Sequence, residues 1–307
     1  MTRMRALESY VIVVAVAVGA VSAAVISASN IESRFALVSA ADKDGAPILG
    51  LAADDFIIED GGTRCVVLGA TPASYPVAIV VDTSSFARSD FQQLRDAVHQ
   101  FIGALSGRDV ALFASSALPT RVVDFTKDVG QLEDGIAHTF AQPNSAPRTL
   151  DAIADAARSL RERRGSLTRI VVVSAGGPDS SSRTPREALD AVVASRSIVD
   201  VVDLQETHTR ASRDDERSAK TVIPSQLRSD NDAALLRALS QSTLGVYERI
   251  VTPSGYAVSL QKVRGQILSE IVVEYAVPPE LPRNLRVGVR LPGAVVRGIA
   301  LERSPDS

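Results

Sequence analysis

The sequence contains short, mostly apolar runs, separated by longer segments with apolar residues at helical spacing. Four of the runs cover residues 77–81, 110–114, 170–174 and 199–204. A run without alternation predicts a strand that is buried on both faces, as in the centre of a parallel sheet. Because strands alternate with helical segments, we expect an α/β fold with a doubly wound, mostly parallel sheet in which these four runs are neighbours.

The segments between and after the runs complete this pattern. Residues 91–105 predict an amphipathic helix, with Ser89 or Asp90 as the candidate N-cap. Residues 205–229 are polar with only scattered apolar positions, which predicts a flexible insertion. The other expected elements are helices at 149–160, 185–196, 231–242 and 255–269, a short helix through Leu132, Ile136 and Phe140, and short strands at 120–124 and 246–249.

Both flanks of this α/β region, which spans residues 73–269, predict β-structure. In the first flank, residues 31–72, the sequence Asp60-Gly61-Gly62 separates two strand-like runs as a hairpin turn would. In the second flank, residues 270–307, apolar residues alternate at period two, as is typical of antiparallel strands with one solvated face. We expect the two flanks to pair with each other into one small β element.

The N-terminal residues 1–30 have the pattern of an export signal. Arg3 and Arg5 precede an apolar stretch over residues 10–28. Two interpretations stay open: a signal peptide cleaved near Val21-Ser22-Ala23, or an uncleaved anchor, since about 20 apolar residues span a bilayer. The positive flank favours a cytoplasmic N-terminus, so we expect the body of the chain to be exported. It would lie on the outer face of the membrane if anchored, and be periplasmic or secreted if cleaved.

Composition narrows the candidate chemistry. The formal net charge of −3 gives no reason to expect a nucleic-acid partner. The single cysteine, Cys65, excludes an internal disulfide framework and a cysteine-based zinc site, and is expected to be a small core residue of a strand. His99, His138 and His208 show no metal-ligand spacing.

Taken in order, these features resemble a von Willebrand factor type A domain, and the flanks resemble the bacterial secreted proteins related to it. The first flank of those proteins has a spaced series of acidic residues and glycines, and a strand ending in tyrosine opens the second, as in residues 272–275 here. The matching positions of the first flank are Asp42, Gly45, Gly50, Leu51, Asp55, Phe56, Glu59, Asp60 and Gly61. The resemblance covers nearly everything after residue 33 and implies the α/β fold described above.

The resemblance also implies a metal-ion-dependent adhesion site at the carboxyl edge of the sheet. Asp82, Ser84 and Thr149 match three of its five ligand positions, whereas Phe86 and Ala175 stand where a serine and an aspartate are expected. A hard cation needs several oxygen ligands. We therefore expect a degenerate site, with at most weak Mg²⁺ or Mn²⁺ binding and no other cofactor.

Two alternatives to a degenerate metal site stay open: another aspartate replaces the missing ligand, or the matching residues have a purely structural role. Asp151 or Asp179 is a candidate replacement for the missing carboxylate, and the alternative use of Asp82, Ser84 and Thr149 is to hydrogen-bond across the loops and hold the scaffold.

Two classes of function fit this pattern. The first is a binding or scaffold module that recognises a protein partner through loops at the carboxyl edge, with or without a cation. The second is a hydrolase that uses Ser84 or Ser85 as its nucleophile. A serine nucleophile needs a base in reach, and the sequence has neither a Gly-x-Ser-x-Gly elbow nor a histidine-containing constellation. We therefore expect a binding module and not an enzyme.

Overall fold

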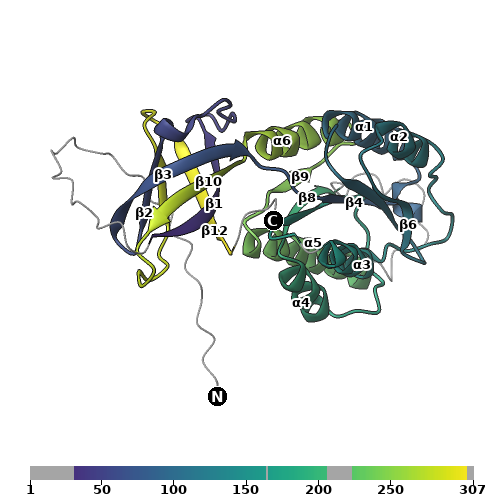
Figure 1. The fold of residues 1–307 in the computed structure, drawn as a ribbon. Helices are drawn as coiled ribbons and strands as arrows, with labels where there is room; N and C mark the ends of the chain where they lie inside the picture. Colours follow the sequence, from purple (N-terminus) through teal and green to yellow (C-terminus); the bar gives the residue numbers. More distant parts are fainter. Residues whose placement is uncertain (1–30, 164, 206–222, 303–307) are drawn as a thin grey trace, which may run out of the picture.

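The computed structural model describes residues 31–163, 165–205 and 223–302, which form two six-stranded sheets side by side (Figure 1). The expected export segment, most of the expected insertion and His208 lie outside these residues. Within the described part of the chain, no helix has the length and apolarity that a membrane span requires.

The first sheet has the strand order β6-β5-β4-β7-β8-β9. Edge strand β6 is antiparallel to β5, and all other neighbours are parallel. The strands are β4 (Val77–Asp82), β5 (Val110–Ser115), β6 (Thr120–Thr126), β7 (Thr168–Ser174), β8 (Ser197–Leu204) and β9 (Tyr247–Ile250). The four apolar runs are β5, β4, β7 and β8, so the prediction that they are parallel neighbours is confirmed.

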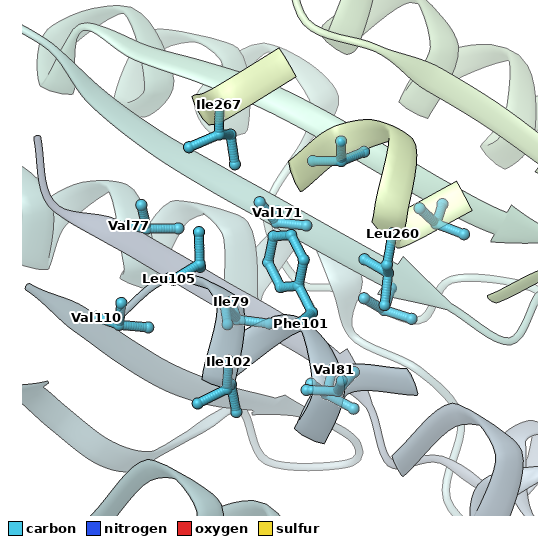
Figure 2. Close-up of a cluster of buried hydrophobic side chains, with 14 of the residues drawn as sticks. Val77, Ile79, Val81, Phe101, Ile102, Leu105, Val110, Val171, Leu260 and Ile267 are labelled. Carbon is cyan, nitrogen blue, oxygen red and sulfur yellow. The ribbon is translucent and has the colours of Figure 1, made fainter. Parts of the chain in front are cut away.

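Helices cover both faces of this sheet (Figure 1). The three on one face are α1 (Phe91–Ala104), α2 (Val129–Ala137) and α6 (Gly255–Ser269); the three on the other are α3 (Thr149–Glu162), α4 (Pro185–Ser195) and α5 (Ile223–Ser242). A hydrophobic core lies on each face of this sheet, and alternate residues of β4 point into the two cores. Val77, Ile79 and Val81 pack under α1 and α6 (Figure 2), whereas Ala78 and Val80 pack under α3. This is the doubly wound arrangement that the apolar runs predicted.

Three details differ from the prediction. Phe140 lies beyond the end of α2 and is 66% exposed, so it is not part of that helix. Helix α5 begins at Ile223, so the expected insertion at 205–229 is helical at its end. Asp90 does occupy the N-cap of α1, but its carboxylate accepts a hydrogen bond from Ser89 (2.9 Å) and makes no capping bond.

The second sheet is antiparallel, with the order β11-β2-β3-β10-β1-β12. Its strands are β1 (Glu32–Ala41), β2 (Phe56–Asp60) after a short 3₁₀ turn (Ala53–Asp55), β3 (Thr63–Pro72), β10 (Ile271–Val277), β11 (Arg286–Val289) and β12 (Val295–Leu301). Strand β1 of the first flank lies between β10 and β12 of the second, which confirms that the flanks pair. The sheet curls until its edges meet, since Gly298 of β12 leaves no room for a Cβ beside Val287 of β11. We call this sheet the β unit.

A buried charge cluster lies where the chain passes between the two sheets. Arg169, at the start of β7, is fully buried; its Nε donates to Asp200 (2.5 Å) and its Nη1 to Glu270 (2.7 Å). The same Nη1 donates to the hydroxyl of Tyr75 (2.9 Å), which also contacts Glu270. Tyr75 and Glu270 belong to the two connecting segments, so Arg169 fixes both to the parallel sheet.

Candidate functional site

The candidate site begins at the carboxyl end of β4, where the buried apolar run gives way to Asp82. The side chain is only 2% exposed. Its Oδ1 accepts the main-chain N–H of Ser84 (2.8 Å), and its Oδ2 accepts the N–H of Ala175 (3.1 Å). Asp82 therefore links the loop after β4 to the loop after β7, the two loops that meet where a ligand would bind in an open α/β sheet.

Asp82 is a buried carboxylate that is held by hydrogen bonds. Burial raises its pKa to about 6, although hydrogen bonds from Ser84 and Ala175 favour the charged form. The nearby charge of Asp179 raises the pKa further.

Ser84 and Thr149 flank Asp82, and each makes hydrogen bonds that hold the loops. Ser84 is fully buried, and its Oγ accepts the N–H of Phe86 (3.3 Å) as the cap of a 3₁₀ turn (Ser85–Ala87). Thr149 opens α3, and its N–H donates to Asp179 (2.7 Å). The structure thus brings the three expected residues to one edge of the sheet, with Thr149 linked to Asp179.

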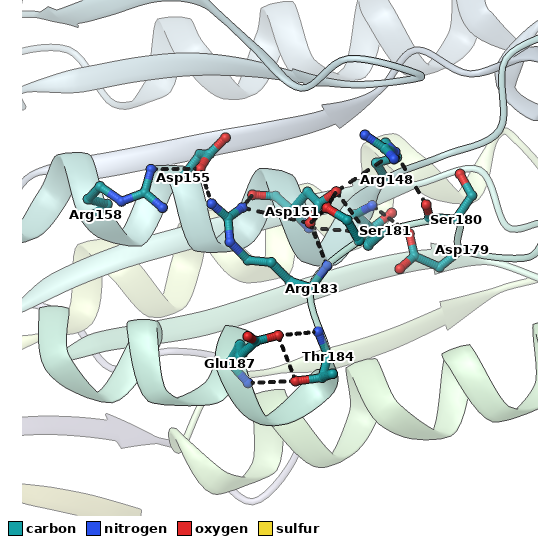
Figure 3. A network of polar contacts seen from close by, with 12 residues as sticks. Arg148, Asp151, Asp155, Arg158, Asp179, Ser180, Ser181, Arg183, Thr184 and Glu187 are labelled. Atoms are coloured by element: carbon teal, nitrogen blue, oxygen red, sulfur yellow. Dashed lines mark hydrogen bonds and ion pairs between the residues drawn. The ribbon is translucent and has the colours of Figure 1, made fainter.

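Asp151 and Asp179, the candidate replacements for the missing carboxylate, both hold the loop after β7 against α3 (Figure 3). Asp151 accepts the N–H groups of Ser182 (3.0 Å) and Arg183 (2.9 Å). Burial favours a higher pKa for Asp151, but these bonds outweigh it and hold the pKa below its usual value. Burial raises the pKa of Asp179, whose Oδ1 also accepts the hydroxyl of Ser181 (3.1 Å). Both carboxylates therefore have structural partners.

Phe86 and Ala175 change the site in different ways. Ala175 contributes only its N–H, which Asp82 accepts. The ring of Phe86 lies on the backbone of Gly177, where an added Cβ would be 2.5 Å from Phe86 Cγ. Gly177 has a φ of +84°, which favours glycine. The aromatic ring thus covers the loop that in the related sites carries the second carboxylate.

These residues do not fit a hard cation. Octahedral Mg²⁺ needs several oxygen ligands directed at one point, but Phe86 and Ala175 supply no side-chain oxygen at two of the five expected positions. Among the described residues, no group of three or more His, Cys, Asp or Glu side chains is arranged to hold a metal.

The structure adds residues that sequence reasoning missed. The hydroxyls of Ser115 and Ser116, at the carboxyl end of β5, are buried without a hydrogen-bond partner, and Ser115 is the register partner of Asp82. Asp203 ends β8 and lines a small pocket beside the site together with Thr149, Ser174, Asp179, Gln205 and Asp232. The signal for Ser115 and Asp203 was their place at the ends of apolar runs, the same signal that identified Asp82.

The expected alternative nucleophiles have structural contacts. Ser84 is buried, and the hydroxyl of Ser85 donates to the carbonyl oxygen of Ser145 (2.8 Å). His99 lies on α1 beside Glu133 (3.8 Å), and His138 Nδ1 contacts the Asp134 carbonyl oxygen (2.8 Å). Each of these two histidines thus has a partner outside the loop of Ser84 and Ser85.

Comparison with known proteins supports this description. Residues 77–178 match the family profile of the von Willebrand factor type A domain. No curated protein matches the sequence significantly. A von Willebrand factor type A protein from Catenulispora acidiphila is similar in structure, at 12% identity and a TM-score of 0.50, with 90% of this chain and 74% of that chain covered.

Two further solved structures are similar to part of this chain. BatB from Bacteroides thetaiotaomicron has 15% identity and a TM-score of 0.47, with 62% of this chain and 97% of that chain covered. An aerotolerance-related membrane protein from Bacteroides fragilis has 16% identity and a TM-score of 0.48, with coverage of 63% and 98%. Residues 77–178 thus match the von Willebrand factor type A domain in sequence, and the structure from Catenulispora acidiphila has a similar fold.

Proposed function

We propose that the chain is an exported, membrane-anchored scaffold or protein-binding module whose adhesion site no longer depends on a cation. The observation that carries this proposal is the environment of Asp82. Its carboxylate oxygens accept main-chain N–H groups from Ser84 and Ala175 and so join two loops, while Phe86 and Ala175 supply no side-chain oxygen to a cation. In this proposal the adhesion-site residues hold the loops in place, and the partner contacts the loop surface itself.

Exposed apolar side chains on these loops support recognition of a protein without a metal bridge. Phe86, Leu118 and Phe140 are 45%, 72% and 66% exposed, and lie on the loops after β4, after β5 and after α2. Main-chain hydrogen bonds join these loops: Thr83 N–H donates to Ser115 (2.9 Å), and Gln142 N–H donates to Thr83 (2.7 Å). Large apolar side chains on a rigid base are common at protein interfaces.

A metal titration of the purified chain tests the proposal. Millimolar Mg²⁺ or Mn²⁺ should leave the thermal midpoint almost unchanged. A cation at a hundred times its dissociation constant would stabilise the folded state by about 2.7 kcal/mol and raise the midpoint by several degrees. Such a rise, abolished by Asp82→Ala, would refute the proposal.

Restoring the missing ligands provides the matched positive control. Phe86→Ser and Ala175→Asp together should create cation-dependent stabilisation that either change alone does not, because an aspartate at position 175 supplies the second carboxylate. If the folded double variant still ignores metal, the loops do not follow the family's geometry and the comparison of site residues is wrong.

The raised pKa of Asp82 supports one alternative, a domain that still binds Mg²⁺ and recognises a partner's carboxylate, since a nearby cation would relieve the buried negative charge. The titration above separates the two. A serine-dependent hydrolase is the second alternative, and turnover in a general esterase screen that is lost in Ser84→Ala or Ser85→Ala would support it.

The proposed export rests on the Arg3 and Arg5 flank of the apolar segment. A reporter fused after Ser307 should be active only outside the cytoplasm, and cytoplasmic activity would exclude this location.

A further inference from the structure

An open cleft lies between the edge of the parallel sheet and the β unit, on the opposite side of the sheet order from β6. Its walls come from the C-terminal part of α5, the loop that follows, edge strand β9 and strand β12. The lining residues are Arg237, Gln241, Gly245, Val246, Tyr247, Arg249 and Arg297. Three of the seven are arginines, and none is acidic.

These three arginines have no acidic partner in the described part of the chain. Other arginines of the chain do: Arg158 pairs with Asp155 (3.0 Å), and Arg163 pairs with Asp109 (2.7 Å). In the cleft, the guanidinium of Arg237 instead stacks over the ring of Tyr247, 4.8 Å from its centroid. Arg237 also hydrogen-bonds the side chain of Tyr247, and stacking holds the guanidinium plane while leaving most of its five N–H donors available.

Among the described residues, no carboxylate lines the cleft, and the acids behind it bond to other groups. Asp203 accepts the hydroxyl of Tyr247 (2.7 Å) and the amide of Gln205 (2.9 Å). Asp200 pairs with Arg169, Glu248 with Lys262, and Glu302 with Arg196. The lining of the cleft therefore carries three arginine side chains and no carboxylate, an arrangement that favours an anionic ligand.

We propose that this cleft is a binding site for a small oxyanion with two or more phosphoryl or carboxylate groups. Guanidinium groups bind such oxygens through paired N–H donors, and the side-chain amide of Gln241 adds a neutral donor. Arg237 and Arg249 belong to the α/β domain, and Arg297 belongs to the β unit. A ligand with two charged groups contacts both parts at once and stabilises their relative position.

Calorimetric titration of the full chain with pyrophosphate at low ionic strength tests the site. Pyrophosphate should bind, orthophosphate should bind more weakly, and added salt should weaken both, since exposed charges are screened. Arg237→Gln, Arg249→Gln and Arg297→Gln should each weaken pyrophosphate binding by about tenfold or more, the usual loss for one charge-assisted hydrogen bond.

Arg161→Gln is the matched control. Arg161 is an exposed arginine in the last turn of α3 that does not line the cleft, and its replacement removes the same charge. Arg297→Lys keeps the charge but loses the paired donors, and should fall between wild type and Arg297→Gln. The thermal midpoint without ligand shows whether each variant folds.

Two results would overturn the proposal: no pyrophosphate binding by the wild-type chain, or an equal loss in Arg161→Gln and the three cleft variants. Competition with vesicles that contain a phosphomonoester lipid identifies the source of the oxyanion. If the vesicles displace pyrophosphate from the wild-type chain, the ligand is a lipid headgroup; if they do not, it is a soluble anion. Either result supports the site when the cleft variants lose pyrophosphate binding and Arg161→Gln keeps it.

Discussion

The two ends of the parallel sheet bury charge in opposite ways. At the amino end of β7, Arg169 is surrounded by two carboxylates and a tyrosine hydroxyl, and burial is compensated by ion pairs. At the carboxyl end of β4, Asp82 is as deeply buried, but its hydrogen-bond partners in the described part of the chain are neutral: the N–H groups of Ser84 and Ala175 and the side chain of Ser84. The comparison separates a cluster that contains both signs of charge from a carboxylate that is held by neutral hydrogen-bond donors.

This difference matters because removing a charge should have opposite effects on stability in a buried ion pair and at a buried carboxylate without a charged partner. Removing one member of a pair leaves the other unpaired in the interior, which is costly. A lone carboxylate that is already destabilised gains from losing its charge. The following predictions exploit this contrast.

The largest effect is expected for Arg169→Met, which leaves Asp200 and Glu270 buried without their cation. We expect the free energy of unfolding to fall by about 3–5 kcal/mol, measured by denaturant titration. Arg158→Met is the control, because Arg158 is 59% exposed in its pair with Asp155 and should cost no more than about 1 kcal/mol.

Neutralising the acids should reverse much of this loss. Arg169→Met combined with Asp200→Asn and Glu270→Gln removes the unpaired charges, so it should be more stable than Arg169→Met alone. If Arg169→Met alone is as stable as the wild type, the charge cluster around Arg169 does not stabilise the connection between the two sheets.

The second prediction concerns pH. Because the pKa of Asp82 is raised to about 6 from 3.8, the folded chain binds more protons than the unfolded chain between these values. Stability from this group is therefore present at low pH and lost as pH rises through about 6, by at most about 3 kcal/mol. Asp82→Asn should abolish this fall in unfolding experiments from pH 4 to pH 7.

Asp60 of the β unit is expected to have the opposite effect on the pH dependence of stability. Burial favours a higher pKa for Asp60, but the N–H of Asn284 and the guanidinium of Arg34 outweigh it and hold the pKa below its usual value. The stabilising contribution of Asp60 should be present above the unfolded pKa and lost as pH falls.

If Asp82→Asn leaves the pH profile of stability unchanged, Asp82 titrates normally, and the contrast between Asp82 and Asp60 is wrong.

The smallest effect is expected at the contact between the ring of Phe86 and the backbone of Gly177. Gly177→Ala and Gly107→Ala both place a side chain at a φ of +84°, but only the Cβ at position 177 meets the ring of Phe86. The strained backbone should cost each about 1–2 kcal/mol, and the clash should cost Gly177→Ala about 1–3 kcal/mol more.

Thermal unfolding of the same change in a Phe86→Ser background isolates the contact. With the ring removed, Gly177→Ala should cost no more than Gly107→Ala. If the extra cost persists without Phe86, the ring does not lie on this loop.

The sequence by itself determined the strands and helices, and it showed which expected ligand residues are missing. Mostly apolar runs without strict alternation predict strands that are buried on both faces, so β4, β5, β7 and β8 followed from the pattern alone. The replacements at Phe86 and Ala175 were also visible, because ligand types are read directly from residue types. The hairpin turn of the first flank and the period-two alternation of the second likewise predicted the β unit.

Only the tertiary structure decided which groups compensate each other. Asp82 accepts an N–H from Ala175, 93 residues away, and Arg169 meets Glu270, 101 residues away. Arg169 lies at the start of an apolar run, a position that says nothing about its partners. Periodicity reports which face a residue occupies, but hydrogen-bond and charge partners depend on contacts between distant segments. The arginine cleft has the same origin, since α5, β9 and β12 become neighbours only when the two sheets are assembled.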